Sequence, residues 1–156
     1  MDDLDGVTLI EVSALKSAAV RGAFAYWQGK CLAGALPASC TLDPLDVPRL
    51  LPHLMLKEVR RDPWDFRYRV VGTLVREHSR RDWTGKWMTE IDGQGPGSIL
   101  FRVTRWVAEN AKPAIYRPPY VGPHKEFKYC EAALLPWVDA NGQIDRVLAA
   151  ADFLTN

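Results

Sequence analysis

The sequence predicts an α+β domain in which one five-stranded antiparallel sheet is covered by helices on one face. Three observations lead to this prediction: strand-like segments in two groups, helix-forming segments between the groups, and a long amphipathic segment before them. The chain has 156 residues, of which 47% are hydrophobic and 25% are charged. This composition is ordinary for one soluble domain that is large enough to bury its own core.

The N-terminal amphipathic segment, from Val12 to about Leu32, is rich in helix formers and carries apolar side chains at helical spacing. We expect its apolar stripe to be buried against the outer face of the sheet or against a second chain. The next segment contains four prolines, which prevent a long helix. Within it, Asp43-Pro44 is a helix-start signal and predicts a short helix over residues 45–51.

The five strand-like segments begin with LMLKEVRR and FRYRVVG, which flank the turn residues DPWD and predict a hairpin. The other three are AIYRPPYV, EFKYCEAALLPW and IDRVLAAADFL. Two prolines predict that AIYRPPYV is an edge strand or is irregular, and Asn141-Gly142 predicts a tight turn before the last strand. Alternation in FRYRV predicts that its aromatic residues face inward and that Arg67 and Arg69 lie on the back of the sheet.

Two helices are predicted between the groups of strands. Thr73 is a candidate N-cap for a short helix over residues 74–80, and Ser98 is one for a longer helix over residues 99–110. The apolar face of the longer helix is expected to consist of Ile99, Leu100, Val103, Trp106 and Val107.

Charge and cysteine content limit the classes of partner. The net charge is +1, and the nine basic residues between Lys57 and Lys86 are interleaved with five acidic ones, which argues against a nucleic-acid partner. Three cysteines do not form a disulfide framework, and charged residues interrupt the most apolar early segment. We therefore expect a cytoplasmic protein with reduced thiols and no membrane association.

Short motifs in a fixed order carry a family resemblance over roughly residues 26–153. They are Tyr26-Trp27, Leu36-Pro37, Asp43-Pro44, Leu51-Pro52, Phe66-Arg67-Tyr68-Arg69, Gly72-Thr73, Asp82-Trp83-Thr84-Gly85, Leu135-Pro136 and Asp152-Phe153. With these motifs, and with two strands, helices and three strands in that order, the chain resembles the small, often single-domain PAS proteins of alphaproteobacteria. This resemblance divides the chain into an N-terminal tail and helix, residues 1–25, and a PAS-like domain, residues 26–156.

The resemblance implies a non-catalytic sensory or adaptor module that binds a small molecule, a signalling partner protein, or both. PAS domains often pair through the helix before their core, so it also implies a homodimer. The expected dimer interface includes Leu15, Ala19, Phe24 and Trp27. The chain offers no segment for a kinase, cyclase or DNA-binding output, so we expect a separate signalling protein to supply the output.

The resemblance leaves the cofactor unknown. Flavin photoreceptor PAS domains carry a reactive cysteine in an Asn-Cys-Arg motif, which this sequence lacks, so a flavin adduct is not expected. Haem PAS domains usually place an axial histidine on the long helix before the third strand. That helix has no histidine here, and a lone His78 on the short helix is more often structural, so haem is not expected. Histidines and cysteines form no short-spaced pair, which argues against a metal site.

Aromatic residues are the candidate walls of a pocket between the sheet and the helices, and an apolar or aromatic small molecule would suit such walls. The candidates are Phe66, Tyr68, Val70, His78, Trp83, Trp87, Trp106 and Tyr129. The small residues Ala149 and Ala151 on the last strand are expected to leave room for a ligand. The alternative role of the tryptophans is ordinary core packing.

The alternative function is that of a small α+β pocket enzyme of the isomerase or hydrolase type. It requires an acid–base pair in the cavity. The candidates are Asp82, Glu90, Glu131 and Asp152. The sequence assigns no catalytic residue, because the stretch Gly95-Pro96-Gly97-Ser98 lacks the pattern of a nucleophile elbow.

Overall fold

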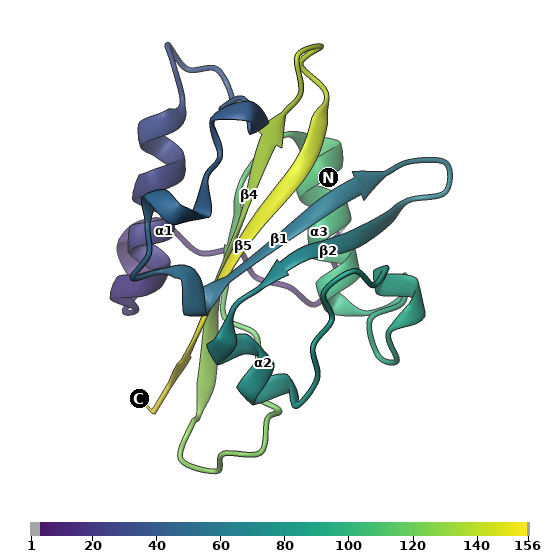
Figure 1. Ribbon diagram of the computed structural model, residues 1–156. Helices are drawn as coiled ribbons and strands as arrows, with labels where there is room; N and C mark the ends of the chain where they lie inside the picture. The colour runs from purple at the N-terminus through teal and green to yellow at the C-terminus, as the bar shows by residue number, and fades with distance from the viewer. Residues whose placement is uncertain (1–3, 156) are drawn as a thin grey trace.

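A computed structural model describes residues 4–155, and its elements follow the predicted order (Figure 1). The strands form one antiparallel sheet in the order β2-β1-β5-β4-β3. Their bounds are β1 Leu54–Arg60, β2 Asp65–Val71, β3 Ala114–Tyr116, β4 Tyr129–Val138 and β5 Ile144–Leu154. The α-helices of the described residues are α1 Ala18–Lys30, α2 Thr73–Ser79 and α3 Ile99–Asn110. The predicted α+β class with a five-stranded antiparallel sheet is confirmed.

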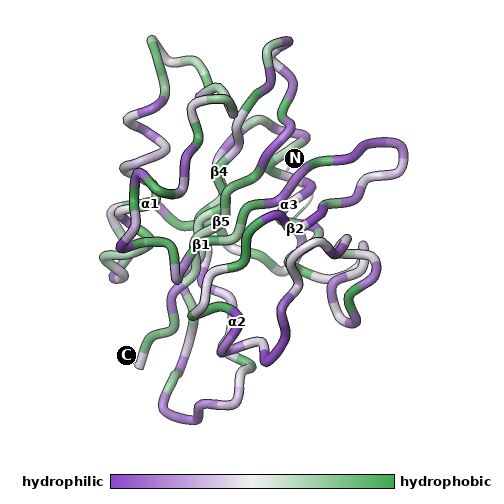
Figure 2. The backbone as a smooth tube through the Cα atoms, viewed as in Figure 1, coloured by the Kyte–Doolittle hydropathy of each residue, from purple (hydrophilic) through white to green (hydrophobic). Residues whose placement is uncertain are grey.

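The central strands β4 and β5 are buried on both faces of the sheet. Their apolar residues form a nearly continuous run rather than a strict alternation, and every residue from Cys130 to Trp137 is buried. The helix α1 covers one face, called the outer face, and α2 and α3 lie on the other, inner face (Figure 1). Hydrophobic residues gather along the central strands, whereas the tip of the β1–β2 hairpin is hydrophilic (Figure 2).

Both edges of the sheet are covered by other segments of the chain. On β2, the Tyr68 N–H donates to the Lys86 carbonyl at 3.0 Å. On β3, the Ile10 N–H donates to the Ile115 carbonyl at 2.8 Å, so the N-terminal segment adds to this edge. The prediction of an edge strand at β3 is confirmed, and neither edge presents a long row of free backbone groups.

The helix α1 packs on the outer face of its own sheet, which is one of the two alternatives expected for its apolar stripe. It begins later than predicted, because Ser17 is its N-cap and accepts the Val20 N–H at 3.1 Å. Trp27 is 7% exposed, and its Nε1–H donates to the Pro136 carbonyl at 2.8 Å. The helix continues without a break across the predicted boundary between residues 25 and 26.

A buried carboxylate on β4 holds the start of α1 against the sheet. Glu131 accepts the Lys16 and Ser17 N–H groups at 2.9 and 2.7 Å, and the Arg117 Nε–H at 2.9 Å. The Ser17 hydroxyl donates at 2.7 Å to Asp152, the cross-strand partner of Glu131. Free N–H groups at a helix start favour a negative charge, so this contact fixes where α1 begins.

The strand β2 contains a β-bulge that changes the direction of its last side chains. The register with β1 shifts at Arg69, which lies between two aligned pairs. Phe66 and Tyr68 therefore face inward as predicted, whereas Val70 packs with the outer cluster beneath α1 and Val71 takes the inward position. The expected inward face of Val70 is corrected by this extra residue.

The helix α2 begins at Thr73, and its N-cap is Gly72 rather than the expected Thr73. A side chain at Gly72 would collide with the backbone carbonyls of Leu51 and Pro52. Glycine is required here by this close approach of the backbone, and the contact seats α2 against the end of the preceding turn.

Of the other two predicted helices, the longer one is present as predicted and the short one before the sheet is not. The predicted span of α3 matches the structure, and Ser98 accepts the Phe101 N–H at 3.2 Å as its N-cap. Ile99, placed on the buried face by the sequence, is instead 42% exposed. The short helix predicted over residues 45–51 is replaced by two separate 3₁₀ turns, because the prolines interrupt any longer helix.

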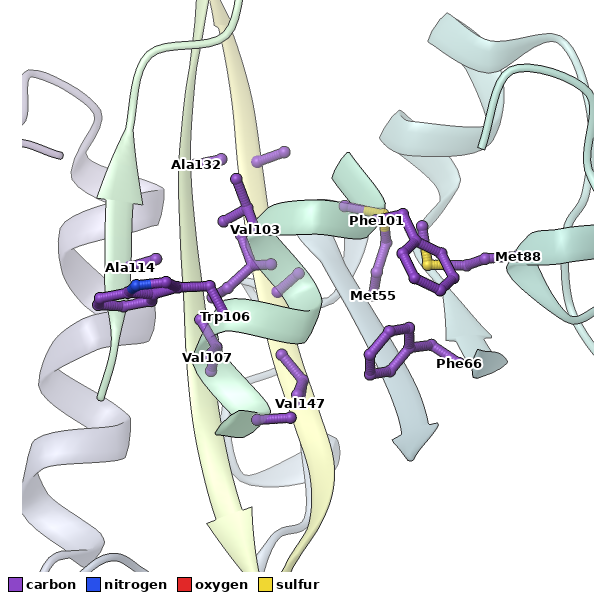
Figure 3. Packing of buried hydrophobic residues seen from close by; sticks show 14 of the residues in the cluster. Met55, Phe66, Met88, Phe101, Val103, Trp106, Val107, Ala114, Ala132 and Val147 are labelled. Atoms are coloured by element: carbon purple, nitrogen blue, oxygen red, sulfur yellow. The ribbon is translucent and has the colours of Figure 1, made fainter. Parts of the chain in front are cut away.

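The inner core lies between α3 and the sheet (Figure 3). Phe66 and Phe101 meet edge to face with ring centroids 5.2 Å apart, and Met55 and Met88 lie beside them (Figure 3). Trp106 packs in the same cluster. These large side chains fill the space between α3 and the sheet.

One lysine, Lys57, is buried in this core without an acidic partner. Lys57 on β1 is fully buried; its Nζ donates to the Thr104 hydroxyl at 3.0 Å and lies 5.5 Å from the centroid of the Tyr68 ring. Burial lowers the pKa of the Lys57 amine to about 7. The fold therefore favours the neutral amine, because a desolvated ammonium without a carboxylate partner is costly.

We predict that Lys57→Met stabilises the protein most at and below pH 7. The unfolded amine keeps its ordinary pKa of 10.5, whereas the folded pKa is about 7. Between these values the unfolded chain binds more protons, so wild-type stability rises with pH by up to about 1.4 kcal/mol per pH unit. The excess stability of the variant over the wild type should therefore decrease as the pH rises from about 7 to 10.5. Urea unfolding at several pH values in this range measures the decrease.

The matched control is Lys112→Met, which removes an exposed amine. Its effect on the free energy of unfolding should be small and should not follow the same pH profile. A Lys57→Met difference that stays constant from pH 7 to 10.5 would contradict the neutral buried amine.

Candidate functional site

A cavity of about 570 Å³ lies between the inner face of the sheet and the segments around α2 and the start of α3. Its floor consists of Met55, Tyr116, Cys130, Ala132, Leu134, Ala149, Ala151 and Phe153. Its other walls consist of His78, Ser79, Trp83, Asp92, Gly93, Gln94, Ser98, Ile99, Leu100, Pro118, Pro119 and Val121. This volume is within the usual range for small-molecule sites.

Small residues on the central strands create this space. Ala132 lies opposite Ala151 on the next strand, and Ala149 lies opposite Leu134. These side chains point to the inner face, where three alanines leave a hollow that larger residues would fill. The sequence-based expectation that Ala149 and Ala151 leave room agrees with this arrangement.

A buried amide forms one polar point of the cavity wall. Gln94 is 7% exposed, and its Oε1 accepts the Tyr68 hydroxyl at 2.7 Å. The Nε2 group of Gln94 has no hydrogen-bond partner among residues 4–155. Burial raises the pKa of Tyr68, so its hydroxyl stays protonated and keeps the Gln94 carbonyl occupied.

A histidine held by aromatic side chains forms a second polar point. The His78 ring stacks on Phe153 with centroids 3.8 Å apart, and its Nδ1 lies 2.8 Å from the Tyr120 hydroxyl. The same hydroxyl accepts the His124 backbone N–H at 3.0 Å. Tyr120 thereby ties the β3–β4 loop, residues 117–128, to α2 beside the cavity.

Three titratable groups of the cavity wall, His78, Tyr116 and Cys130, are biased toward their neutral forms. Burial, and next the nearby His124, lower the pKa of His78. Burial raises the pKa of Tyr116, and burial followed by the charge of Asp152 raises the pKa of Cys130 to about 11. At neutral pH these three side chains therefore supply polar groups to the cavity wall without carrying a charge.

The structure brings two of the predicted wall residues, His78 and Trp83, to the cavity. Tyr68 lies directly behind this wall, with its ring 5.3 Å from that of Trp83 and its hydroxyl on Gln94. Phe66 is fully buried in the neighbouring core.

The other predicted wall residues lie away from the cavity. Val70 belongs to the outer cluster, and Trp106 fills the core under α3. Trp87 lies beside the sheet edge, with the Arg60 guanidinium 4.2 Å from its ring centroid. Tyr129 precedes inward-facing Cys130 on β4, so alternation turns it to the outer face.

Sequence reasoning missed several wall residues, including Gln94, Tyr116, Cys130 and Phe153. Alternation within the last strands was a usable signal for Cys130 and Phe153, because both share a face with Ala151. No local pattern marked Gln94, which lies in an irregular segment and reaches the cavity only through the tertiary fold.

The acidic residues required by the enzyme alternative do not meet in the cavity. Glu131 and Asp152 are cross-strand neighbours, but they lie on the outer face and accept hydrogen bonds from the start of α1. Asp82 and Glu90 flank a separate hollow beside Trp83. This placement gives the isomerase or hydrolase alternative no support from the cavity geometry.

Other chemical features of the described residues are few. The three cysteines are free thiols. Within residues 4–155, no group of three or more histidine, cysteine, aspartate or glutamate side chains is arranged to hold a metal ion. No helix in this part of the chain has the length and apolar character needed to cross a bilayer.

The strand order β2-β1-β5-β4-β3, with helices between β2 and β3 and a cavity on the inner face, defines a PAS-like fold. Among solved structures, the chain is similar to the crystal structure of a sensory box sensor histidine kinase from Vibrio cholerae. The TM-score is 0.51 and the identity 19%, over 72% of this chain and 92% of that one. This likeness shows the fold. No protein-family model and no curated protein matches the chain.

We predict that Tyr120→Phe loosens the β3–β4 loop. The substitution removes the hydroxyl that joins His78 Nδ1 and the His124 N–H. Each hydrogen bond contributes about 0.5–1.5 kcal/mol net, so loss of both should make local opening roughly five- to hundredfold more frequent. Amide hydrogen exchange of residues 117–128 measures this change.

Tyr129→Phe is the matched control, because its hydroxyl is buried without a hydrogen-bond partner among the described residues. It should leave exchange in the loop unchanged. Equal exchange rates in Tyr120→Phe and wild type would show that the hydroxyl does not hold the loop.

Proposed function

We propose that the chain is a PAS sensory module that binds an apolar or aromatic small molecule in the inner-face cavity and passes the change to a separate signalling protein. The observation that carries this proposal is the cavity itself, with about 570 Å³ of space over a floor of small and apolar residues. The PAS-like fold and the resemblance to single-domain PAS proteins of alphaproteobacteria support a non-catalytic, cytoplasmic module of this kind.

The loop beside the cavity and the aromatic rings that line it also suit small-molecule binding. The cavity lies beside the β3–β4 loop, whose Tyr120 hydroxyl contacts α2, and we infer that opening of this loop admits a ligand while the sheet stays folded. Aromatic rings of Trp83, Tyr116 and Phe153 line it, and such rings bind flat apolar molecules well.

We predict that Ala149→Leu abolishes small-molecule binding without unfolding the protein. The larger side chain occupies the hollow above Leu134, so it fills space instead of overpacking a core. Native mass spectrometry and an absorption spectrum of freshly purified protein detect a retained molecule. Amide shifts on titration with a panel of aromatic compounds detect binding to the apo form.

Ala140→Leu, in the exposed turn between β4 and β5, is the control and should bind as the wild type does. Shifts at the floor residues Ala132 and Ala149 in the wild type would locate the ligand. If no compound is retained and none causes shifts there, small-molecule sensing by this cavity is ruled out and a purely protein-binding role is favoured.

We also propose a homodimer that pairs through the outward face of α1. Leu15 and Trp27 are 4% and 7% exposed within the chain, so they serve the sheet contact. Ala19 and Phe24 are only partly buried and lie on opposite flanks of the buried stripe of α1, and the exposed Ala25 lies on the outward side of the helix. A second copy of the chain could contact these three residues while α1 stays packed on its own sheet.

Sedimentation equilibrium at micromolar concentrations is expected to give twice the monomer mass. Ala25→Glu should shift the protein toward the monomer, because it adds a charge to the proposed contact. Lys112→Met, at an exposed position that follows α3, should leave the mass unchanged. A monomeric mass for the wild type at tens of micromolar would exclude the dimer.

A further inference from the structure

Three hydrogen-bond donors converge on the cavity wall without protein partners among the described residues. They belong to Gln94, Tyr116 and His78, which are 7%, 5% and 9% exposed. The Gln94 Nε2 group is free because only its carbonyl oxygen is engaged, by Tyr68. These donor atoms are not among the fully buried, unpartnered groups of the described residues, so each is open to an acceptor that a ligand in this apolar space would supply.

The hydrogen bonds around Tyr120 favour one tautomer of His78. The Tyr120 oxygen accepts the His124 N–H at 3.0 Å and lies 2.8 Å from His78 Nδ1, so we assign the hydroxyl hydrogen of Tyr120 to this nitrogen. A neutral imidazole that accepts at Nδ1 carries its hydrogen on Nε2. Nε2 has no partner among the described residues, so it contributes an N–H group to the cavity.

The charge around the cavity excludes anionic ligands. No lysine or arginine lines it among the described residues, and the one charged side chain in its wall is the exposed Asp92. A carboxylate or phosphate placed in this apolar space would lose its hydration without gaining a cation. The donors present are therefore suited to neutral acceptors such as carbonyl oxygens.

We propose that the cavity selects neutral aromatic carbonyl compounds, whose ring lies over the alanine floor and whose carbonyl oxygen accepts hydrogen bonds from Gln94, Tyr116 or His78. This inference rests on the proposed function, because it names the chemical class of the ligand sensed by the same cavity. The aromatic walls supply affinity for the ring, and the three donors supply the preference for a carbonyl over a hydrocarbon.

Three probes with one ring system test this preference: 2-acetylnaphthalene, 2-ethylnaphthalene and 2-naphthoate. Binding to the full chain is measured by titration calorimetry, and amide shifts at Ala132 and Ala149 locate each probe. The ketone should bind about two- to tenfold more tightly than the hydrocarbon, since one net hydrogen bond separates them. The carboxylate should bind more weakly than both.

A matched pair of variants assigns the preference to the cavity. Tyr116→Phe removes one donor and should reduce the ratio of ketone to hydrocarbon affinity while hydrocarbon affinity stays nearly constant. Tyr129→Phe removes a hydroxyl on the outer face and should leave the ratio unchanged. A lower ratio of ketone to hydrocarbon affinity in His78→Phe as well would identify His78 as a second donor to the carbonyl oxygen.

Four outcomes distinguish the two proposals. A ketone preference that falls in Tyr116→Phe supports the ligand class. Equal binding of ketone and hydrocarbon overturns the ligand class but leaves small-molecule sensing intact. Tightest binding of 2-naphthoate overturns the ligand class in favour of an anion. Absence of binding by all three probes, together with no retained molecule, overturns the proposed function and this inference with it.

Discussion

Burial of β4 and β5 on both faces is the constraint on which the rest of the structure depends. Their nearly continuous apolar residues cannot be shielded by one layer, so helices must cover both sides of the sheet. The segments α2 and α3 supply the inner cover, and α1 supplies the outer one (Figure 1). The N-terminal helix is thus a component of the core and not an appendage to the PAS-like domain.

Three ionisable side chains that are buried by this arrangement differ in how their charge is accommodated. Glu131 is matched by helix N–H groups and a guanidinium, so its buried charge positions α1. Asp65 similarly accepts the Phe66 N–H and pairs with Arg60 at the start of β2. Lys57 differs, since its amine has a single hydroxyl partner and is neutralised instead. Charge in the interior is therefore either fully paired or removed by a change in pKa.

Local sequence signals predicted most of the helices and strands, but they predicted few of the residues that line the cavity. Caps and periodicity predicted α3 over residues 99–110, because these interactions lie within a few residues of one another. Val70 was misplaced because the bulge at Arg69 arises from pairing with another strand. Gln94 and Glu131 act through partners far away in the sequence, at separations that no local pattern encodes.

The cavity and the anchor of α1 use alternate residues of the same two strands. Cys130 and Phe153 face the cavity, and their neighbours Glu131 and Asp152 hold the start of α1 on the opposite face. Neighbouring residues share one backbone, so a displacement of these strands by a ligand also displaces the carboxylates beneath the helix. A ligand shifts α1 only to the extent that it binds two strand arrangements with different affinity. The fold thereby provides a short physical connection from the cavity to the outer surface, which is the surface that we propose for the contact with a second chain.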